Sequence, residues 1–260
     1  MPRRLSFLLV AGGAALGLAA GCGGSPTSPS GTWPPHTQSQ ATAHFDFHYA
    51  QGDSVDTAWQ EAFHQWATRE LQVTVTRRIA YYKYMTPAHM LALHNGPGTV
   101  NAWADPDRWT LHTIWPADNH ETIHLYASLI GGATSLFNEG LAVAFQVDPV
   151  RGDLTPRWNN RHVHDVAMSL RLQGRLPPLG SMLTLDAFRS LDTQVAYPTA
   201  GSFVRYLIDA QGGIGPIRTL LAQSTHADPA SVTRAHVEAA WGRSLDALEA
   251  AWLAFLDARR

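Results

Sequence analysis

Two helix-forming runs that meet at a Gly-Gly pair constrain this 260-residue chain more than any other feature. The first run contains His120-Glu121-Thr122-Ile123-His124, and the second, over 135–147, contains Glu139. Two helices joined by a tight turn at Gly131-Gly132 pack antiparallel against each other. This geometry returns Glu139 towards the helix face that carries the two histidines.

The spacing of these residues predicts a metal site. His120 and His124 stand four residues apart, so about one helical turn places both imidazoles on the same face. Zinc in a catalytic site takes three protein ligands and leaves a fourth position to water. We therefore expect one zinc ion per chain, held by His120, His124 and Glu139. Glu121 directly follows the first histidine and is the expected general base.

Simpler interpretations of the same residues remain open at this point. Asp118 and Glu121 could form a capping-box-like pair at the start of a surface helix whose histidines are merely solvated. Glu139 could be an exposed helix residue, although a carboxylate among apolar neighbours is unfavourable unless it is paired or binds a metal. The coincidence of the two motifs favours metal ligation.

The motif His120-Glu121-x-x-His124, followed by Phe137-Asn138-Glu139-Gly140-Leu141-Ala142, resembles the gluzincin metallopeptidases. It is most similar to their aminopeptidase-N, thermolysin-like and small peptidase-MA-like groups. The resemblance implies a zinc metallopeptidase with His120, His124 and Glu139 as ligands and Glu121 as general base. Two features depart from the pattern of this family. The interval from His124 to Glu139 is a few residues shorter than in the best-known members. Val143 also stands where an acidic partner of a histidine ligand is usual.

A further stretch, 197–207, resembles the helix that follows the ligand helices in small members of this group. In those relatives a tyrosine near the helix start reaches the zinc-bound substrate. This likeness makes Tyr197 the candidate that stabilises the oxyanion. The alternative is that Tyr197 is an ordinary aromatic core residue, as we expect for Tyr206.

The N-terminus predicts export. Arg3 and Arg4 precede an apolar stretch over 5–20, which is short for a membrane span. Ala19-Ala20-Gly21-Cys22 then resembles the lipobox of bacterial lipoproteins, which implies a signal peptide over 1–21 and a lipid on Cys22. The lipid would anchor the protein to the outer side of a bacterial membrane. The alternative is a generic signal peptide in which Cys22, the only cysteine, is incidental.

Composition separates the remaining chain into a linker and one folded domain. Residues 22–42 are rich in Gly, Ser, Pro and Thr and predict a flexible linker. The hydrophobic content of 45% and nine tryptophans predict a sizeable core over 43–260. The net charge of −2 and the lack of a basic patch argue against a nucleic-acid partner. The expected partners are a peptide or protein substrate and the membrane, and the expected state is a monomer.

Within 43–260 we expect an α+β fold with a small mixed-sheet lobe over 43–115 and a mostly helical lobe over 116–260. The zinc helix would lie at the cleft between them. Period-two alternation predicts a strand over 44–49, and 79–85 reads as a second strand. A helix follows Asp53-Ser54, and Thr86-Pro87 opens a short one. A hairpin is predicted over 100–104 and 109–114. In gluzincins an edge strand binds the substrate backbone, and 109–114 is the expected equivalent.

The chain beyond residue 150 predicts helices over 161–172, 199–210, 215–222, 231–241 and 244–256. Two groups of histidines have open interpretations. His112, on the expected edge strand, could contact substrate, but an exposed strand histidine is the simpler interpretation. His162, His164 and Asp165 could form a second metal cluster, although histidines on a polar helix are usually solvated.

Three functions are compatible with these residues. The first is a lipid-anchored zinc peptidase. The second is a metallohydrolase of another amide, such as one in the cell wall, since the metal and the base serve any amide. The third is a zinc-containing lipoprotein that acts as a binding or structural module without turnover. Glu121 argues against the third, because a structural site needs no base and normally closes with a fourth protein ligand.

Overall fold

The structure of this chain is a computed structural model that describes residues 33–94 and 100–259. The described residues fall into two compact units, each built from separate stretches of chain. The part before Asp56 and Ile79–Pro116 form the first unit, and Asp56–Arg78 and the chain from Ala117 onward form the second. A five-stranded sheet lies in the first unit and nine α-helices in the described part of the second, so the α+β prediction is confirmed.

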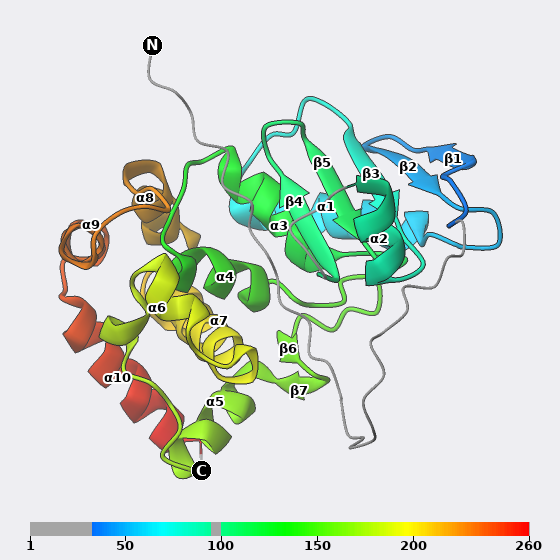
Figure 1. The fold of residues 1–260 in the computed structure, drawn as a ribbon. Helices are drawn as coiled ribbons and strands as arrows, with labels where there is room; N and C mark the ends of the chain where they lie inside the picture. The colour runs from blue at the N-terminus through cyan, green and yellow to red at the C-terminus, as the bar shows by residue number, and fades with distance from the viewer. Residues whose placement is uncertain (1–32, 95–99, 260) are drawn as a thin grey trace, which may run out of the picture. The chain divides into compact units, whose positions relative to one another are not determined.

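The first unit is a mixed sheet with the strand order β1-β2-β3-β5-β4 (Figure 1). β2, β3 and β5 are parallel neighbours, and β1 and β4 pair antiparallel at the two edges. The elements of this unit are β1 (Gln38–Ala41), β2 (Phe45–Tyr49), β3 (Ile79–Lys83), α2 (Pro87–His94), β4 (Ala102–Asp105) and β5 (Thr110–Thr113).

Alternating side chains explain the central strands. Phe45 and Phe47 of β2 are fully buried, whereas Asp46 and His48 between and after them are partly exposed. The parallel register sets Phe47 opposite Tyr81 of β3, and their rings lie 5.0 Å apart. Aromatic pairs across neighbouring strands stabilise a sheet beyond the burial of their area. The strands predicted over 44–49 and 79–85 are therefore confirmed, as are the hairpin of β4 and β5 and the short helix α2.

The prediction of an edge strand at 109–114 is wrong. β5 pairs with β3 on one side and with β4 on the other, so neither side is open to an added strand. The hairpin places β4 outside because β5 takes the parallel pairing with β3. His112 on β5 is accordingly buried rather than exposed. Its ring stacks on Trp103 with a centroid separation of 4.1 Å, and Nδ1 lies 2.9 Å from the Tyr84 hydroxyl.

Part of the predicted linker is also structured. Gln38–Ala41 of the segment 22–42 forms β1, which pairs antiparallel with β2. All four residues of β1 have exposed side chains. Backbone hydrogen bonds to β2 therefore hold this strand, which explains why its polar composition did not reveal it.

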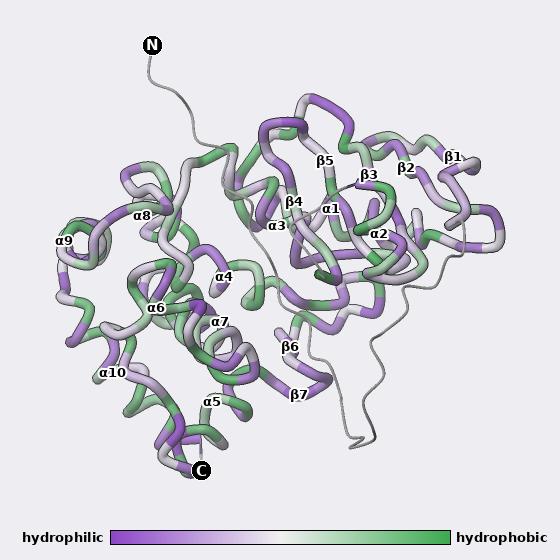
Figure 2. The backbone as a smooth tube through the Cα atoms, in the orientation of Figure 1, coloured by the Kyte–Doolittle hydropathy of each residue, from purple (hydrophilic) through white to green (hydrophobic). Residues whose placement is uncertain are grey.

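The second unit is mostly helical. Its last helix, α10, is amphipathic, and the tube in Figure 2 alternates between hydrophobic and hydrophilic colours along it. The elements are α1 (Thr57–Leu71), α3 (Asn119–Ser128), α4 (Ser135–Ala144), β6 (Arg157–Trp158), β7 (Arg161–His162), α5 (Val163–Leu172), the 3-10 turn η1 (Leu179–Met182), α6 (Leu185–Arg189), α7 (Thr193–Ala210), α8 (Ile214–Gln223), α9 (Ala230–Trp241) and α10 (Leu245–Asp257). All five helices predicted beyond residue 150 are present, although α7 begins six residues before the predicted start at 199.

The predicted lobe boundary at 115/116 is wrong for α1. This helix belongs to the second unit, where it packs on α3. Gln60 of α1 donates through Nε2 to Thr122 Oγ1 at 2.8 Å and accepts from the Asp118 N–H at 2.9 Å. His64 of α1 also forms a hydrogen bond through Nδ1 with the hydroxyl of Tyr126 of α3. The helix also begins later than directly after Asp53-Ser54, because Asp56 is its N-cap residue.

Glycines allow α4 and α7 to approach closely, and the two helices lie side by side in Figure 1. A Cβ atom added at Gly140 of α4 would lie 2.8 Å from the carbonyl oxygen of Ala200 and 2.6 Å from Val204 Cγ2. A Cβ atom at Gly201 of α7 would lie 2.2 Å from Val143 Cγ1. Each helix therefore has a glycine at the position where a side chain or the backbone of the other helix packs against it.

A buried hydrogen-bond network joins α5, α7 and α10. Ser202 Oγ lies 2.8 Å from His164 Nδ1 and accepts from Trp252 Nε1 at 3.1 Å. The indole can only donate, so the serine oxygen accepts there and its own hydroxyl proton can be donated to His164 Nδ1. His164 is thus buried and neutral, not solvated as expected. Burial, with the positive charge of nearby His162, lowers its pKa to about 3.

Among the residues that the structure describes, no helix combines the length and the apolar composition needed to cross a membrane.

The packing of α4 on α7 predicts the effect of Gly140→Ala. Alanine favours a helix by up to about 1 kcal/mol over glycine, but overpacking against backbone typically costs about 1–3 kcal/mol. We expect the free energy of unfolding in urea to fall by about 1–2 kcal/mol. Gly215→Ala is the matched control, because a Cβ atom there meets nothing within 4 Å and it also lies in a helix. Equal stability of the two variants would contradict the account.

The neutral state of His164 predicts acid sensitivity. The pKa of His164 is about 3 in the folded protein and about 6.5 in the unfolded chain. Between pH 3 and pH 6.5 the imidazole is therefore protonated only in the unfolded chain. Stability therefore falls as the pH drops below about 6.5, by up to about 1.4 kcal/mol per pH unit for this group. Urea unfolding at pH 7 and pH 5 should show a smaller loss for His164→Asn than for the parent. An identical loss would refute this assignment.

Candidate metal centre

The helix α3 begins where its capping residue dictates. Asp118 has extended backbone angles, and its side chain accepts a hydrogen bond from the Glu121 N–H at 3.0 Å. This satisfies one of the free N–H groups at the helix start. His120 and His124 follow in the first two turns, one above the other on the same face. The cap that seemed to compete with a metal site thus positions the histidines.

The turn between α3 and α4 fixes where Glu139 lies. Gly131 packs so closely on α8 that an added Cβ atom would lie 2.0 Å from the carbonyl oxygen of Leu221. Gly132 then forms an antiparallel bridge with Ser224. Only glycine fits the first position, and the turn is therefore anchored to a third helix. It starts α4 at Ser135, and Glu139 is the fifth residue of α4.

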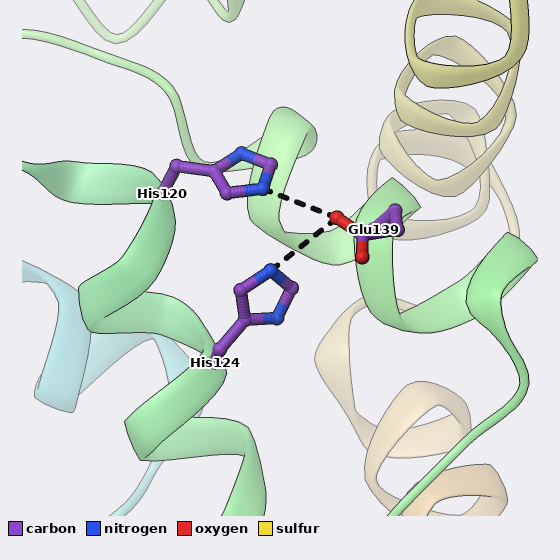
Figure 3. Close-up of side chains that lie close together, drawn as sticks. All are labelled: His120, His124 and Glu139. Atoms are coloured by element: carbon purple, nitrogen blue, oxygen red, sulfur yellow. Dashed lines mark hydrogen bonds and ion pairs between the residues drawn. The ribbon is translucent and has the colours of Figure 1, made fainter. Parts of the chain in front are cut away.

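His120, His124 and Glu139 converge on one point from two helices (Figure 3). Glu139 Oε2 lies 3.2 Å from His120 Nε2 and 3.3 Å from His124 Nε2. One ligand atom from each of the three residues lies within 4.8 Å of the other two. The three side chains are buried, so the interpretations of a solvated surface helix and an exposed Glu139 are both wrong.

Charge complementarity holds this buried group together. Burial by itself raises the pKa of Glu139, but the positive charge of His124 and hydrogen bonding from His120 outweigh it and lower the pKa to about 2. Burial likewise lowers the pKa of His124, but the carboxylates of Glu139 and Glu121 and the side chain of Asn138 reverse the effect and raise it to about 9. Glu139 is therefore ionised within a buried site.

These residues fit a metal ion. A buried carboxylate facing two imidazole nitrogens is a donor set that divalent transition metals use. A cation at their common point would replace the shared proton and satisfy both nitrogens and the carboxylate at once. Within the described ranges 33–94 and 100–259, no other three residues of ligand type come as close together. The possible cluster of His162, His164 and Asp165 is thus not formed.

Glu121 lies in α3 between the two histidines, and only 1% of it is exposed. Its carboxylate is close enough to His124 to raise the pKa of that ring. A buried acid next to two ligand residues belongs to the same site. The structure therefore places the proposed base within the electrostatic reach of the ligands.

Tyr197 lies in α7 beside the centre. Its ring centroid is 6.1 Å from that of His120 and 5.5 Å from that of Trp158, on which it stacks. The tyrosine is buried, as the interpretation as a core residue expects, and its ring is also a neighbour of His120. Asp192 caps α7, so Tyr197 is the fifth residue of this helix. Pro198 lies inside the helix and not at its start. The capping signal at Asp192-Thr193 was missed, since proline usually marks the first turn.

Two neighbours of the centre were not predicted. Gln146 follows the end of α4, and its Nε2 lies 3.1 Å from His120 Nδ1. It stands seven residues, or about two helical turns, after Glu139, which is a signal that could have found it. His226 packs on the Gly131-Gly132 turn, where its Cδ2 would lie 3.6 Å from a Cβ atom at Gly132. No local pattern links His226 to the ligands.

The structure thus brings together His120, Glu121, His124, Glu139 and Tyr197 within the second unit, whereas Cys22 lies outside the described residues. The arrangement offers three ligand atoms, a buried acid and a phenol near one point. It has the groups needed to bind a metal ion and to move a proton beside it. Comparison with protein-family models, with curated proteins and with solved structures gives no match to this chain.

Proposed function

We propose that this protein is a zinc-dependent hydrolase of the peptidase type. One observation carries the proposal: two histidines one turn apart and a glutamate from the next helix meet in a buried group. Two imidazoles and one carboxylate match the ligand set of catalytic zinc in hydrolases, in which a fourth position stays open. A closed structural site normally has four protein ligands, and three residues of ligand type meet here within the described part of the chain.

Zinc held by these residues would lower the pKa of a bound water to near 7 and polarise the substrate carbonyl. Glu121 would take the proton from the attacking water and later deliver it to the nitrogen of the leaving amine. The Tyr197 hydroxyl would donate to the substrate oxygen that becomes negative in the transition state. His120, His124 and Glu139 would hold the metal, and their burial would limit the access of bulk water to the site.

The proposal includes the location of the protein. The lipobox-like sequence ending at Cys22 supports export and a lipid anchor on the outer side of a bacterial membrane. Residues 33–37 carry no regular secondary structure before β1 begins at Gln38. A peptide or protein substrate outside the cell fits this placement and the peptidase-like motif.

Removing one ligand should abolish metal binding. We expect the purified protein to hold near one zinc per chain by elemental analysis and His124→Ala to hold almost none at the same free zinc concentration. His162→Ala is the control, because it also removes a partly buried histidine but leaves the three ligands intact. A metal content in His124→Ala equal to that of the parent would exclude the assigned ligands.

Removing the base should stop turnover without removing the metal. Glu121→Gln should retain near one zinc and hydrolyse casein or a peptide library at least about 100-fold more slowly, since general acid–base catalysis contributes 10²–10⁴-fold. Restoration of the parent's activity by zinc after chelation would support metal dependence. A rate for Glu121→Gln within about tenfold of the parent would exclude Glu121 as the base.

The contribution of Tyr197 is tested separately. Loss of one oxyanion donor typically lowers kcat by about 10²–10³. Tyr197→Phe keeps the ring that packs on Trp158 and removes only the hydroxyl, so the stability of the fold should change little. We expect kcat to fall by this factor with an unchanged zinc content. An unchanged kcat would assign Tyr197 to the core alone.

A further inference from the structure

His120 is held from both sides. Nε2 faces Glu139 Oε2 at 3.2 Å, and Nδ1 faces Gln146 Nε2 at 3.1 Å. A carboxylate oxygen of Glu139 can only accept, so a neutral, metal-free ring in this geometry would carry its proton on Nε2. Nδ1 is then an acceptor, and the amide nitrogen of Gln146 donates to it. The contacts of this ring are therefore consistent with a single tautomer.

A metal on Nε2 would demand the opposite tautomer. When Nε2 donates its electron pair to a metal, the proton of the neutral ring must be on Nδ1. Gln146 would then have to accept a hydrogen bond instead of donating one. A glutamine side chain can do both, because rotation of its amide by about 180° exchanges the NH₂ group for the oxygen at the same place. A carboxylate could only accept, and an ammonium group could only donate.

The backbone holds Gln146 where this exchange can occur. Its N–H donates to the carbonyl of Val143 at 3.1 Å, and its C=O accepts from the Arg157 N–H of β6 at 3.0 Å. The adjacent carbonyl of Val147 accepts from Asn119 Nδ2 at 3.3 Å, directly before His120. The side chain is half-buried, so its amide is not fully enclosed by the protein.

We propose that Gln146 is the positioning residue of the metal ligand His120 and that its amide reverses when a metal ion binds. An acidic residue usually partners a histidine ligand from the position where Val143 stands. Gln146 takes that role in this protein. This inference rests on the metal binding included in the proposed function. It adds that a neutral, reversible group, and not a carboxylate, orients this ligand. The charge at the centre then comes from the metal ion, Glu139 and Glu121 without a further acid.

Zinc affinity tests the positioning role. It is measured by competition with a chromogenic chelator, and urea unfolding of the metal-free variants checks that each one folds. Gln146→Leu should weaken zinc binding by about 10–100-fold, as is typical when an outer partner of a ligand is removed. Gln146→Glu keeps an acceptor for the loaded state and should bind zinc at least as tightly as the parent. Gln65→Leu, at an exposed glutamine of α1, should leave the affinity unchanged.

Nitrogen-15 NMR of protein labelled at both histidine and glutamine tests the reversal itself. The His120 proton should be found on Nε2 in the metal-free protein and on Nδ1 in the zinc-loaded protein, and the amide protons of Gln146 should shift between the two states.

The outcomes separate the two proposals. A parent protein that binds no zinc overturns both. If the parent binds zinc and His124→Ala does not, an affinity of Gln146→Leu within about threefold of the parent overturns only the role of Gln146. A Gln146→Glu variant that binds as weakly as Gln146→Leu also overturns it, because acceptance of the Nδ1 proton would then contribute nothing. A proton that stays on Nε2 after loading overturns the reversal.

Discussion

The pairing of the Glu139 carboxylate with two imidazoles is the interaction on which the second unit depends. An ionised carboxylate removed from water is strongly unfavourable unless charge or hydrogen bonds compensate it. Here His120 and His124 compensate it at 3.2 and 3.3 Å, and the three groups stabilise one another's charge states. A metal ion would satisfy all three more completely. The surrounding helices can therefore be viewed as the scaffold that makes a buried acid tolerable.

Close helix packing provides that scaffold. Gly140 stands directly after Glu139 and lets α4 approach α7. Gly201 of α7 in turn leaves space for the side chain of Val143 of α4. Side chains at both positions would push the helices apart, and the acid would move away from the histidines. On the other side, Gln60 and His64 of α1 bond to α3 and hold the histidine helix in place. The ligand geometry is thus set by packing on both ligand helices rather than by the ligands alone.

Local signals made much of this predictable from the sequence. The cap at Asp118, the four-residue spacing of the histidines and the Gly-Gly turn each act within a few residues, and together they predicted the α3–α4 pair. Features decided by partners distant in sequence were missed. β5 became an inner strand because it pairs with β3, α1 joined the helical unit through contacts 62 residues away, and β1 is held by backbone bonds that composition does not reveal. His226 packs on the Gly131-Gly132 turn from a distant part of the chain and was missed for the same reason.

The network of Ser202, His164 and Trp252 has a consequence for how the protein is made. Trp252 lies in α10, and Ser202 lies next to the glycine by which α7 packs on α4. Domains are synthesised from the N-terminus, so the ribosome releases both ligand helices long before it releases the tryptophan. During that interval the nascent chain carries a charged acid and two imidazoles without the last helix that buttresses their surroundings. The packing of α10 on α5 and α7 can therefore be completed only after α3 and α4 have been synthesised.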